Sequence, residues 1–320
     1  MKIANSVLDL IGNTPMVKLK KINEDVNVRV LAKLEYANPS GSMKDRIALK
    51  MIEEAEKERI LKPGYTIVES STGNTGTSLS FVGAMKGYRV VIYETIPGKM
   101  GEEKIKIMKN YGAEVKVITP RELENLEEKS VPGAEIELPG RRICINLESS
   151  NPNIWWARQF SNPNNVRAHY DTGKEILAQT NGDVDAFVMS IGTGGTLMGV
   201  AEVLRKNISQ VRIIGVIPAA SKKDMIPGKP YPRTEISGGI ISDLMEKPDL
   251  IDEIVRVGDQ DAVKMTHRLW KEEGLFAGVS SGANVLVAVK EAQSLGKGKT
   301  VVTILPDSGD RYLTEEHYVT

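Results

Sequence analysis

The chain has 320 residues with 42 basic and 42 acidic side chains, so its formal net charge is zero. That balance offers no electrostatic reason to bind nucleic acid or a membrane surface. The length of 320 residues predicts about two lobes. The single cysteine, Cys144, excludes an intrachain disulfide, and we expect it to be a buried packing residue. Because the N-terminus has no apolar stretch of signal-peptide length, we expect a cytoplasmic protein.

Short β-branched runs alternate with amphipathic helices along the chain, which predicts α/β lobes with parallel sheets. We expect strands at Met16–Leu19, at Val28–Leu34, from Tyr65, at Tyr88–Tyr93 and at Val115–Ile118, and later strands near Ala186, Val211, Ile254 and Val301. The apolar run Arg142–Asn146 is interpreted as a further strand. Trp155 and Trp156 are interpreted as part of a helix that packs between the lobes.

The first candidate for chemistry lies between Asn38 and Arg46. Lys44 stands there between a Gly/Ser turn and an amphipathic helix that continues through Met51. Partial desolvation and the positive end of the helix dipole both disfavour the ammonium form of such a lysine, which leaves more free amine to react with an aldehyde. A lysine alone is weak support for this interpretation, because most lysines are solvated surface charges.

Two further loops have the same strand, turn and helix pattern. The first ends in Ser71-Thr72-Gly73-Asn74-Thr75-Gly76, before a helix expected at Thr77–Met85. Its hydroxyls, amide and backbone N–H groups gather at a helix N-terminus, which suits a carboxylate. The second is Gly192-Thr193-Gly194-Gly195-Thr196, before a helix expected at Leu197–Arg205. Its glycines allow the backbone to close on a phosphate, and its threonines add donors.

A dinucleotide site is the obvious rival for the second loop. Such a site needs a third glycine where this chain has Leu197, and it needs an acidic residue after the next strand, which here ends in Ile217-Pro218. We therefore favour a monophosphate. A reactive amine, an anion-binding loop and a phosphate-binding loop on one chain together suggest a phosphorylated aldehyde cofactor, pyridoxal 5′-phosphate.

With these motifs the chain resembles the cysteine synthase group of fold type II pyridoxal-phosphate enzymes, which includes the O-acetylserine sulfhydrylases and the cystathionine β-synthases. Seven motifs match in order over nearly the whole length. They are Ile11-Gly12-Asn13-Thr14-Pro15, Asn38–Arg46, Gly73-Asn74-Thr75-Gly76, Gln159-Phe160-Ser161-Asn162-Pro163, Gly192–Thr196, Gly278-Val279-Ser280-Ser281-Gly282-Ala283 and Leu305-Pro306-Asp307-Ser308-Gly309-Asp310-Arg311-Tyr312.

The resemblance implies a tryptophan synthase β-like fold with two lobes of parallel-rich, twisted sheets flanked by helices. Residues 1–11 and 35–150 would form the N-terminal lobe, which carries Lys44 and the substrate loop. Residues 12–34 and 151–320 would form the C-terminal lobe, which carries the phosphate loop and Ser280. The cofactor would lie in the cleft between them.

The resemblance also implies a role for each motif residue. Lys44 would form the imine with the cofactor and later act as the proton-transferring base. Asn74 would donate to the phenolic oxygen of the cofactor, Gly192, Thr193, Gly194, Gly195 and Thr196 would hold its phosphate, and Ser280 would face its pyridine nitrogen. The α-carboxylate of the amino-acid substrate would bind to Ser71, Thr72, Gly73, Asn74, Thr75 and Gln159.

The activity implied is β-replacement on an activated serine through an aminoacrylate, forming cysteine from O-acetylserine and sulfide in a homodimeric enzyme. The same chemistry with O-phosphoserine or serine as donor, with homocysteine as acceptor, or from cysteine to serine and hydrogen sulfide stays open. The chain departs from the family pattern at Ser71-Thr72, at Ser237-Gly238-Gly239-Ile240 and along Arg121–Asn146. Asp243 is a candidate for assisting a leaving group, although a capping role is favoured. We expect no metal, since His169, His267 and His317 are far apart in the sequence.

Overall fold

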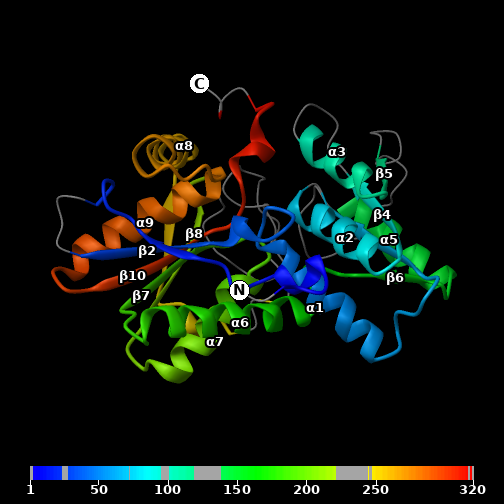
Figure 1. Ribbon diagram of the computed structural model, residues 1–320, viewed down its shortest axis with the longest axis horizontal. Helices are drawn as coiled ribbons and strands as arrows, with labels where there is room; N and C mark the ends of the chain where they lie inside the picture. The colour runs from blue at the N-terminus through cyan, green and yellow to red at the C-terminus, as the bar shows by residue number, and fades with distance from the viewer. Residues whose placement is uncertain are drawn as a thin grey trace.

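The computed structural model describes residues 3–23, 28–71, 73–94, 101–118, 138–220, 244, 247–315 and 318. It confirms the predicted α/β class, since two sheets lie side by side with helices against their faces (Figure 1). The larger sheet has six strands in the order β1-β2-β10-β7-β8-β9, and the smaller has four in the order β5-β4-β3-β6. Among the described pairs, β1 and β2 run antiparallel and the others run parallel.

The strands of the six-stranded sheet are β1 Met16–Lys18, β2 Arg29–Leu34, β7 Ala186–Ser190, β8 Arg212–Pro218, β9 Glu253–Val257 and β10 Thr300–Leu305. Those of the four-stranded sheet are β3 Thr66–Ser70, β4 Arg89–Glu94, β5 Glu114–Val117 and β6 Ile154–Trp156. The α-helices are α1 Lys44–Lys57, α2 Asn74–Met85, α3 Glu102–Asn110, α5 Leu138–Ser150, α6 Asn164–Thr180, α7 Gly195–Asn207, α8 Asp259–Arg268 and α9 Val279–Leu295. The short helical turns are η1 Val7–Leu10, η2 Glu35–Ala37, η3 Pro248–Leu250, η4 Leu269–Glu273 and η5 Gly309–Tyr312.

The six-stranded sheet is buried on both faces, which explains why its central strands are continuously apolar. In β7, Ala186 and Val188 pack on the side of α8 and α9, whereas Phe187 and Met189 pack on the side of α6 and α7. Successive side chains of a strand point to opposite faces, so one short run of residues contributes to two cores. Figure 1 shows α8 and α9 above this sheet and α6 and α7 below it.

The four-stranded sheet follows the same principle with different partners. Ile67 of β3 packs in one core with Met51 of α1 and Leu79 of α2. Val68, the next residue, packs in a separate core with Cys144 of α5. The expected burial of Cys144 is confirmed, because its side chain is fully buried. The first helix, α1, therefore forms part of the core that supports the smaller sheet.

Two sequence predictions about this region are wrong. The run Arg142–Asn146 lies within helix α5, where Ile143 and Cys144 pack inward and Ile145 is 38% exposed. A strand would place Ile143 and Ile145 on the same face, so the burial pattern follows the helical period instead. Trp155 and Trp156 lie in strand β6, which pairs with β3, and their side chains enter opposite cores. That strand belongs to the four-stranded sheet, although our division at residue 150 would assign it to the C-terminal lobe.

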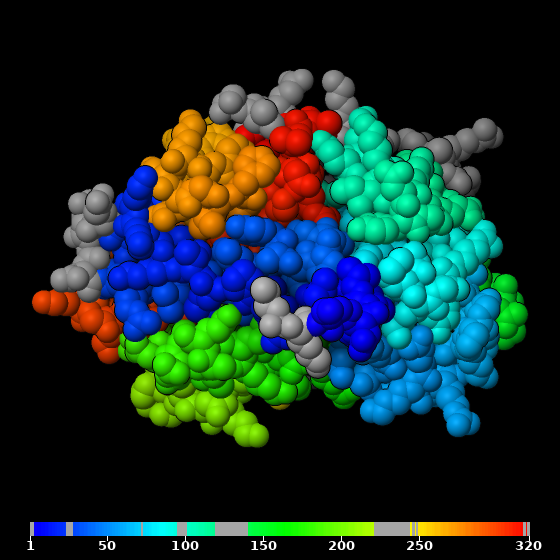
Figure 2. Space-filling model, viewed as in Figure 1, coloured from blue at the N-terminus to red at the C-terminus, as the bar shows by residue number. Residues whose placement is uncertain are grey.

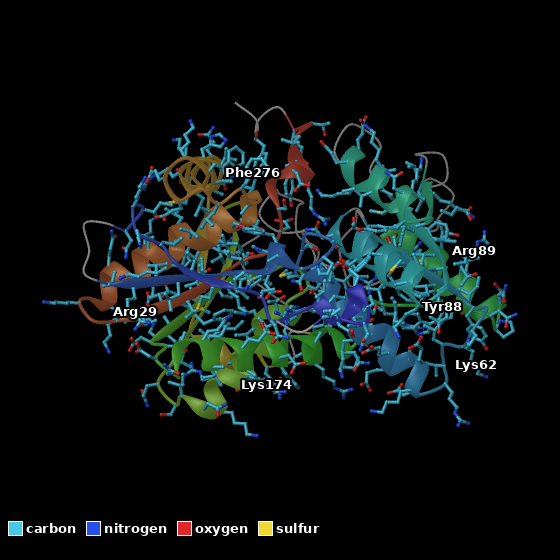
Figure 3. The ribbon with its side chains drawn as sticks, in the orientation of Figure 1. Arg29, Lys62, Tyr88, Arg89, Lys174 and Phe276 are labelled. Atoms are coloured by element: carbon cyan, nitrogen blue, oxygen red, sulfur yellow. The ribbon has the colours of Figure 1, made fainter. Side chains whose placement is uncertain are left out.

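The strands of the two sheets point their carboxyl ends toward each other. Lys62, Tyr88 and Arg89 lie near the amino ends of β3 and β4, at the outer edge of the molecule (Figure 3). Arg29, at the amino end of β2, lies at the opposite outer edge (Figure 3). The loops that follow these strands therefore meet in the middle of the molecule, the usual location of a ligand site in parallel α/β sheets.

The C-terminal segment packs between α8 and α3 in Figure 2. There the Glu103 carboxylate of α3 accepts hydrogen bonds from the backbone N–H and the hydroxyl of Thr314, at 2.6 and 2.9 Å. This segment thus connects the helices of both sheets above the central region. Within the part of the chain that the structure describes, no helix combines the length and apolarity needed to cross a bilayer.

Candidate active site

Lys44 is the first residue of α1 and lies at the centre of the region where the loops meet. Its preceding turn is fixed to the segment after β10, because the N–H of Met43 donates to the carbonyl of Pro306 at 2.8 Å and that of Ser308 donates to Gly41 at 3.1 Å. Burial lowers the pKa of Lys44 to about 8, and the nearby Asp307 carboxylate opposes that shift. About a tenth of this amine is therefore uncharged at pH 7, far more than for an ordinary lysine.

The glycine-rich loop lies directly beside this amine. Lys44, Gly192, Thr193, Gly194 and Thr196 line one small cavity, together with Met43, Ser190 and Leu197. The loop joins β7 to α7, so the first N–H groups of α7 face the cavity without intrahelical acceptors. The structure thus brings the predicted lysine and the predicted phosphate loop together.

Two residues of α6 support the glycine-rich loop from behind. Asn165 donates to the Thr193 hydroxyl at 3.2 Å, and it packs so closely that a Cβ on Gly195 would lie 2.1 Å from its Oδ1. His169 is fully buried, with its Nε2 3.0 Å from the Thr196 hydroxyl. Burial lowers the pKa of His169 well below its usual range, so the ring is neutral. Gly194 itself has a φ of 82°, which favours glycine.

The loop between β3 and α2 gathers hydroxyl and N–H groups at the start of α2. The hydroxyl oxygen of Ser71 accepts from the N–H of Gly76 at 3.0 Å, which folds the turn around the start of α2. The Thr75 hydroxyl donates to Gln159 Oε1 at 2.6 Å, so two predicted carboxylate-binding side chains, far apart in the sequence, are in contact. Gln159 is fixed in turn by Glu69, which accepts from its backbone N–H at 2.9 Å.

Ser280 stands in the first turn of α9, and Asn284 of the same helix fixes its position. The Asn284 side chain accepts from the N–H of Ser190 at 2.7 Å and donates to the carbonyl of Ile304 at 2.9 Å. These two bonds attach the start of α9 to the ends of β7 and β10. The N–H of Gly278 also donates to the carbonyl of Asp307 at 3.0 Å. Ser280 is therefore held at the same edge of the sheet as the glycine-rich loop.

A buried cluster of charges anchors α1 behind the amine. The Arg46 guanidinium binds both oxygens of Glu35, at 2.7 Å each, and both oxygens of Glu175, at 2.7 and 2.8 Å. Lys33 forms a second ion pair with Glu175 at 2.7 Å. Burial alone would raise the pKa of the Glu35 carboxyl, but Arg46 outweighs burial and holds it below its usual value. This cluster fixes the helix that presents Lys44.

The sequence reasoning assigned no role to several residues that the structure places at this site. Asp307 and Arg311 contact Asn74, while Asn165 and His169 support the glycine-rich loop. A signal for Asp307 and Arg311 was present in the matching motif Leu305–Tyr312. In the sequence His169 was considered only as a metal ligand and rejected as one. Its spacing of four from Asn165 on a helix is the signal that indicates a shared face. Three sites singled out from the sequence, namely Thr72, Asp243 and the segment 237–240, lie outside the described residues.

A half-buried amine beside a glycine-rich loop, at the junction of two α/β layers, is the arrangement of an enzyme that binds a phosphorylated aldehyde. The chain belongs to the family described as pyridoxal-phosphate dependent enzyme, whose model matches residues 7–307. The resemblance to the cysteine synthase group, proposed from the sequence motifs, is thereby confirmed at the level of the family.

Known proteins similar to this chain include cysteine synthases and a cystathionine β-synthase. A cysteine synthase of Staphylococcus aureus is 42% identical over 321 residues, covering 99% of this chain and 98% of the relative. The solved structure of a cysteine synthase from Entamoeba histolytica matches with a TM-score of 0.87 and 36% identity, covering 100% of this chain and 92% of that one. An O-acetylserine dependent cystathionine β-synthase from Helicobacter pylori matches with a TM-score of 0.87 and 34% identity, covering 100% of both chains.

The residues present fit pyridoxal phosphate. An aldehyde requires an uncharged amine, and Lys44 has one whose pKa is lowered to about 8 by burial. A phosphate requires converging donors and close backbone approach. A Cβ built on Gly192 would meet no atom within 4 Å, so there is open space beside this loop, which lines one cavity with Lys44. Both requirements are met within one cavity.

Proposed function

We propose that this protein catalyses β-replacement on O-acetylserine, in which sulfide replaces acetate at the β carbon and cysteine forms. The observation that carries the proposal is the shared cavity of Lys44 and the Gly192–Thr196 loop, where a half-buried amine faces a phosphate-binding turn. The 42% identity to a cysteine synthase along almost the entire chain supports the choice of reaction. Pyridoxal phosphate, when bound, supplies an aldehyde that condenses with amines and a ring that withdraws electrons from the α carbon.

In this proposal each loop holds one part of the cofactor or substrate. Lys44 binds the aldehyde carbon, and the backbone N–H groups and hydroxyls of Gly192–Thr196 hold the phosphate. Asn74 donates to the phenolic oxygen, and Ser280 faces the pyridine nitrogen. A neutral hydroxyl at that position does not stabilise a protonated ring as a carboxylate would, which favours chemistry at the β carbon.

The substrate carboxylate binds at the start of α2. The hydroxyls of Ser71, Thr72 and Thr75, the amide of Gln159 and the N–H groups of Gly73 and Asn74 supply the donors. The bond between Thr75 and Gln159 supports this role, since it holds two residues of the set side by side at 2.6 Å. On binding, the Thr75 hydroxyl would turn from Gln159 to the carboxylate. With the carboxylate fixed, the α carbon would face Lys44, whose Nζ, released when the substrate amine takes its place on the aldehyde carbon, would take the α proton and later return it. A positioned amine of this kind contributes about 10² to 10⁴ in rate.

A second candidate keeps the same site and changes the donor or the nucleophile. The match to an O-acetylserine dependent cystathionine β-synthase favours it, because that structure has the same TM-score, 0.87, as the cysteine synthase. Homocysteine would then replace sulfide. O-phosphoserine or serine as donor, and cysteine conversion to serine and hydrogen sulfide, belong to the same alternative.

One set of incubations separates these reactions. The purified protein with pyridoxal phosphate is given O-acetylserine, O-phosphoserine, serine or cysteine, each with and without sulfide or homocysteine, and the amino-acid products are identified. We expect cysteine from O-acetylserine and sulfide, and none from the Lys44→Ala variant. Cystathionine as the main product would favour the second candidate. Full activity of Lys44→Ala without added amine would refute the site itself.

We also infer the organisation of the chain around this site. The division into residues 1–11 with 35–150, and 12–34 with 151–320, is supported by the two sheets, with β6 moved to the first lobe because it pairs with β3. A cytoplasmic homodimer is the assembly that the family resemblance favours. Gel filtration with light scattering tests the dimer, and fractionation of the producing cells tests the location.

A further inference from the structure

The side chain of Asn74 is held between two charged groups of the segment after β10. Arg311 Nη1 donates to Asn74 Oδ1 at 2.7 Å, and Asn74 Nδ2 donates to Asp307 Oδ2 at 2.6 Å. A reversed carboxamide would point N–H groups at the guanidinium and an oxygen at the carboxylate. The two charges therefore allow one orientation. In that orientation one N–H of Asn74 is bound by Asp307 and the other remains for a ligand.

Asp307 is itself held in a buried position. It is 2% exposed, and the Tyr312 hydroxyl donates to the same Oδ2 at 2.5 Å. Burial, and then the Asp307 carboxylate, raise the pKa of Tyr312 well above its usual value, so this hydroxyl stays a donor. The other oxygen, Oδ1, is buried and has no hydrogen-bond partner among the described residues. Gly278 allows this packing, because a Cβ there would lie 2.3 Å from Oδ1.

The same segment is joined to the turn that carries the reactive amine. Residues Ser42 and Asp307 form an antiparallel bridge, so the Asp307 backbone pairs with the residue two positions before Lys44. The Asp307 carboxylate also acts electrostatically on Lys44 and raises the pKa of that amine against the effect of burial. Asp307 is thus in contact with Asn74 and close to Lys44, the two side chains assigned to neighbouring substituents of one bound ring, its phenolic oxygen and its aldehyde.

We propose that Asp307, together with Arg311, is a positioning residue that fixes the carboxamide of Asn74 so that its second N–H faces the bound cofactor. The inference rests on the proposed function, because the acceptor of that N–H is the phenolic oxygen of pyridoxal phosphate. Asp307 acts through Asn74 and does not touch the cofactor itself. Apart from its electrostatic effect on Lys44, the effect of Asp307 on the cofactor should therefore depend on the presence of Asn74.

A double-mutant cycle tests this dependence. Pyridoxal phosphate is titrated into full-length apoprotein of the wild type, Asp307→Ala, Asn74→Ala and the double variant, and its Kd and absorbance maximum are measured. Loss of one hydrogen bond to a charged group predicts that Asp307→Ala weakens binding about 10-fold or more. In the Asn74→Ala background the same substitution should change the Kd by less than about 3-fold, because the effect of Asp307 on binding passes through Asn74. If the two residues acted independently, the substitution would have the same effect in both backgrounds.

Two matched variants distinguish positioning from general damage to the fold. Tyr312→Phe removes the other hydrogen bond to Asp307 Oδ2 and leaves Asn74 untouched, so its Kd and absorbance maximum should match the wild type. Asp307→Asn keeps an oxygen that can accept from both Asn74 and Tyr312, so it should recover most of the binding lost in Asp307→Ala. If Asp307→Ala does not fold, Asp307→Ser removes the carboxylate in the same cycle.

The outcomes separate this inference from the proposed function. Equal effects of Asp307→Ala with and without Asn74, or equal effects of Asp307→Ala and Tyr312→Phe, would overturn the positioning role. Wild-type protein that binds pyridoxal phosphate but forms no cysteine would overturn the proposed reaction, while the cycle still decides the role of Asp307. Wild-type protein that binds no pyridoxal phosphate would overturn both.

Discussion

At pH 7 the amine of Lys44 should react far more readily than that of an ordinary lysine. Its pKa is lowered to about 8, because burial disfavours the ammonium more than Asp307 stabilises it. With that pKa about 9% of the amine is uncharged at pH 7, against about 0.04% for a lysine at the reference value near 10.4. The uncharged fraction is therefore larger by a factor of about 200.

Acylation of the full-length apoprotein measures this difference directly. The protein is treated briefly with an amine-acylating reagent between about pH 6 and pH 11, and the modified peptides are quantified by mass spectrometry. We expect the midpoint for Lys44 near pH 8, following its lowered pKa. Lys174, which projects from the surface (Figure 3), provides the reference curve from the same digest.

Two controls identify the cause. Saturation with pyridoxal phosphate should protect Lys44 and leave Lys174 unchanged, because only the first lies in the cavity beside the glycine-rich loop. Asp307→Asn should move the Lys44 midpoint to lower pH, since the carboxylate raises that pKa. A Lys44 curve that coincides with the Lys174 curve would refute the reasoning, because burial would then have no effect on the amine.

Three other regions of the site and the lysine itself give further predictions. Because the pKa of Lys44 is lower in the folded chain, its charge destabilises the fold fully below about pH 8, and this cost disappears as the pH rises toward about 10.4. Urea denaturation should find Lys44→Met apoprotein about 1 to 3 kcal/mol more stable than wild type at pH 7, with a smaller difference at pH 10. Thr75→Val removes the hydroxyl that Gln159 accepts from, so donor titration should show binding weaker by about 1 to 3 kcal/mol, whereas Thr75→Ser should bind normally. Ser280→Asp should slow β-replacement by stabilising a protonated ring, and identical rates and absorption spectra after addition of donor would contradict this. Arg46→Met leaves the buried Glu35 carboxylate without its cation and Glu175 with Lys33 alone, so guanidinium denaturation should show a loss of about 3 to 5 kcal/mol.

Thr75 and Gln159 also show how the structure changes an expectation from sequence. The family resemblance assigned their side chains to the substrate carboxylate alone. Both are nearly fully buried and bind each other, and Gln159 also donates to the carbonyl of Ser70 at 3.0 Å. We therefore expect Thr75→Val to cost stability as well as binding, which makes Thr75→Ser the necessary control.

The local pattern of the sequence was sufficient for the elements that place the site. Lys44 at a turn-to-helix junction and the glycines after β7 could be recognised because each requirement, a helix start or a glycine at positive φ, lies within a few residues. The strand prediction for Arg142–Asn146 failed because a short apolar run does not by itself distinguish a strand from a helix. Only contact with the four-stranded sheet decides that Cys144 is buried and Ile145 is not.

The parts of the site that the sequence did not predict depend on contacts between distant segments. Asp307 and Asn74 are 233 positions apart, and Arg46 and Glu175 are 129 apart. No periodicity links such pairs, so a motif can indicate that Asp307 matters without indicating what it binds. The same holds for His169, whose partner Thr196 lies on the next helix. Their roles follow from the register of parallel strands, which only the fold determines.

The position of Lys44 shows how an unfavourable group is kept in place. An amine with a lowered pKa is costly to bury, and flexible surroundings would let it turn toward water and regain its charge. On one side α1 is anchored by Arg46, two residues further on, whose guanidinium is bound by two carboxylates. On the other side the turn before Lys44 is fixed by backbone hydrogen bonds to Pro306 and Ser308. Both attachments fix the backbone around Lys44, and neither binds its amine. Nζ therefore remains available while the backbone that carries it is rigid. A residue that takes and returns a proton at one carbon needs both properties.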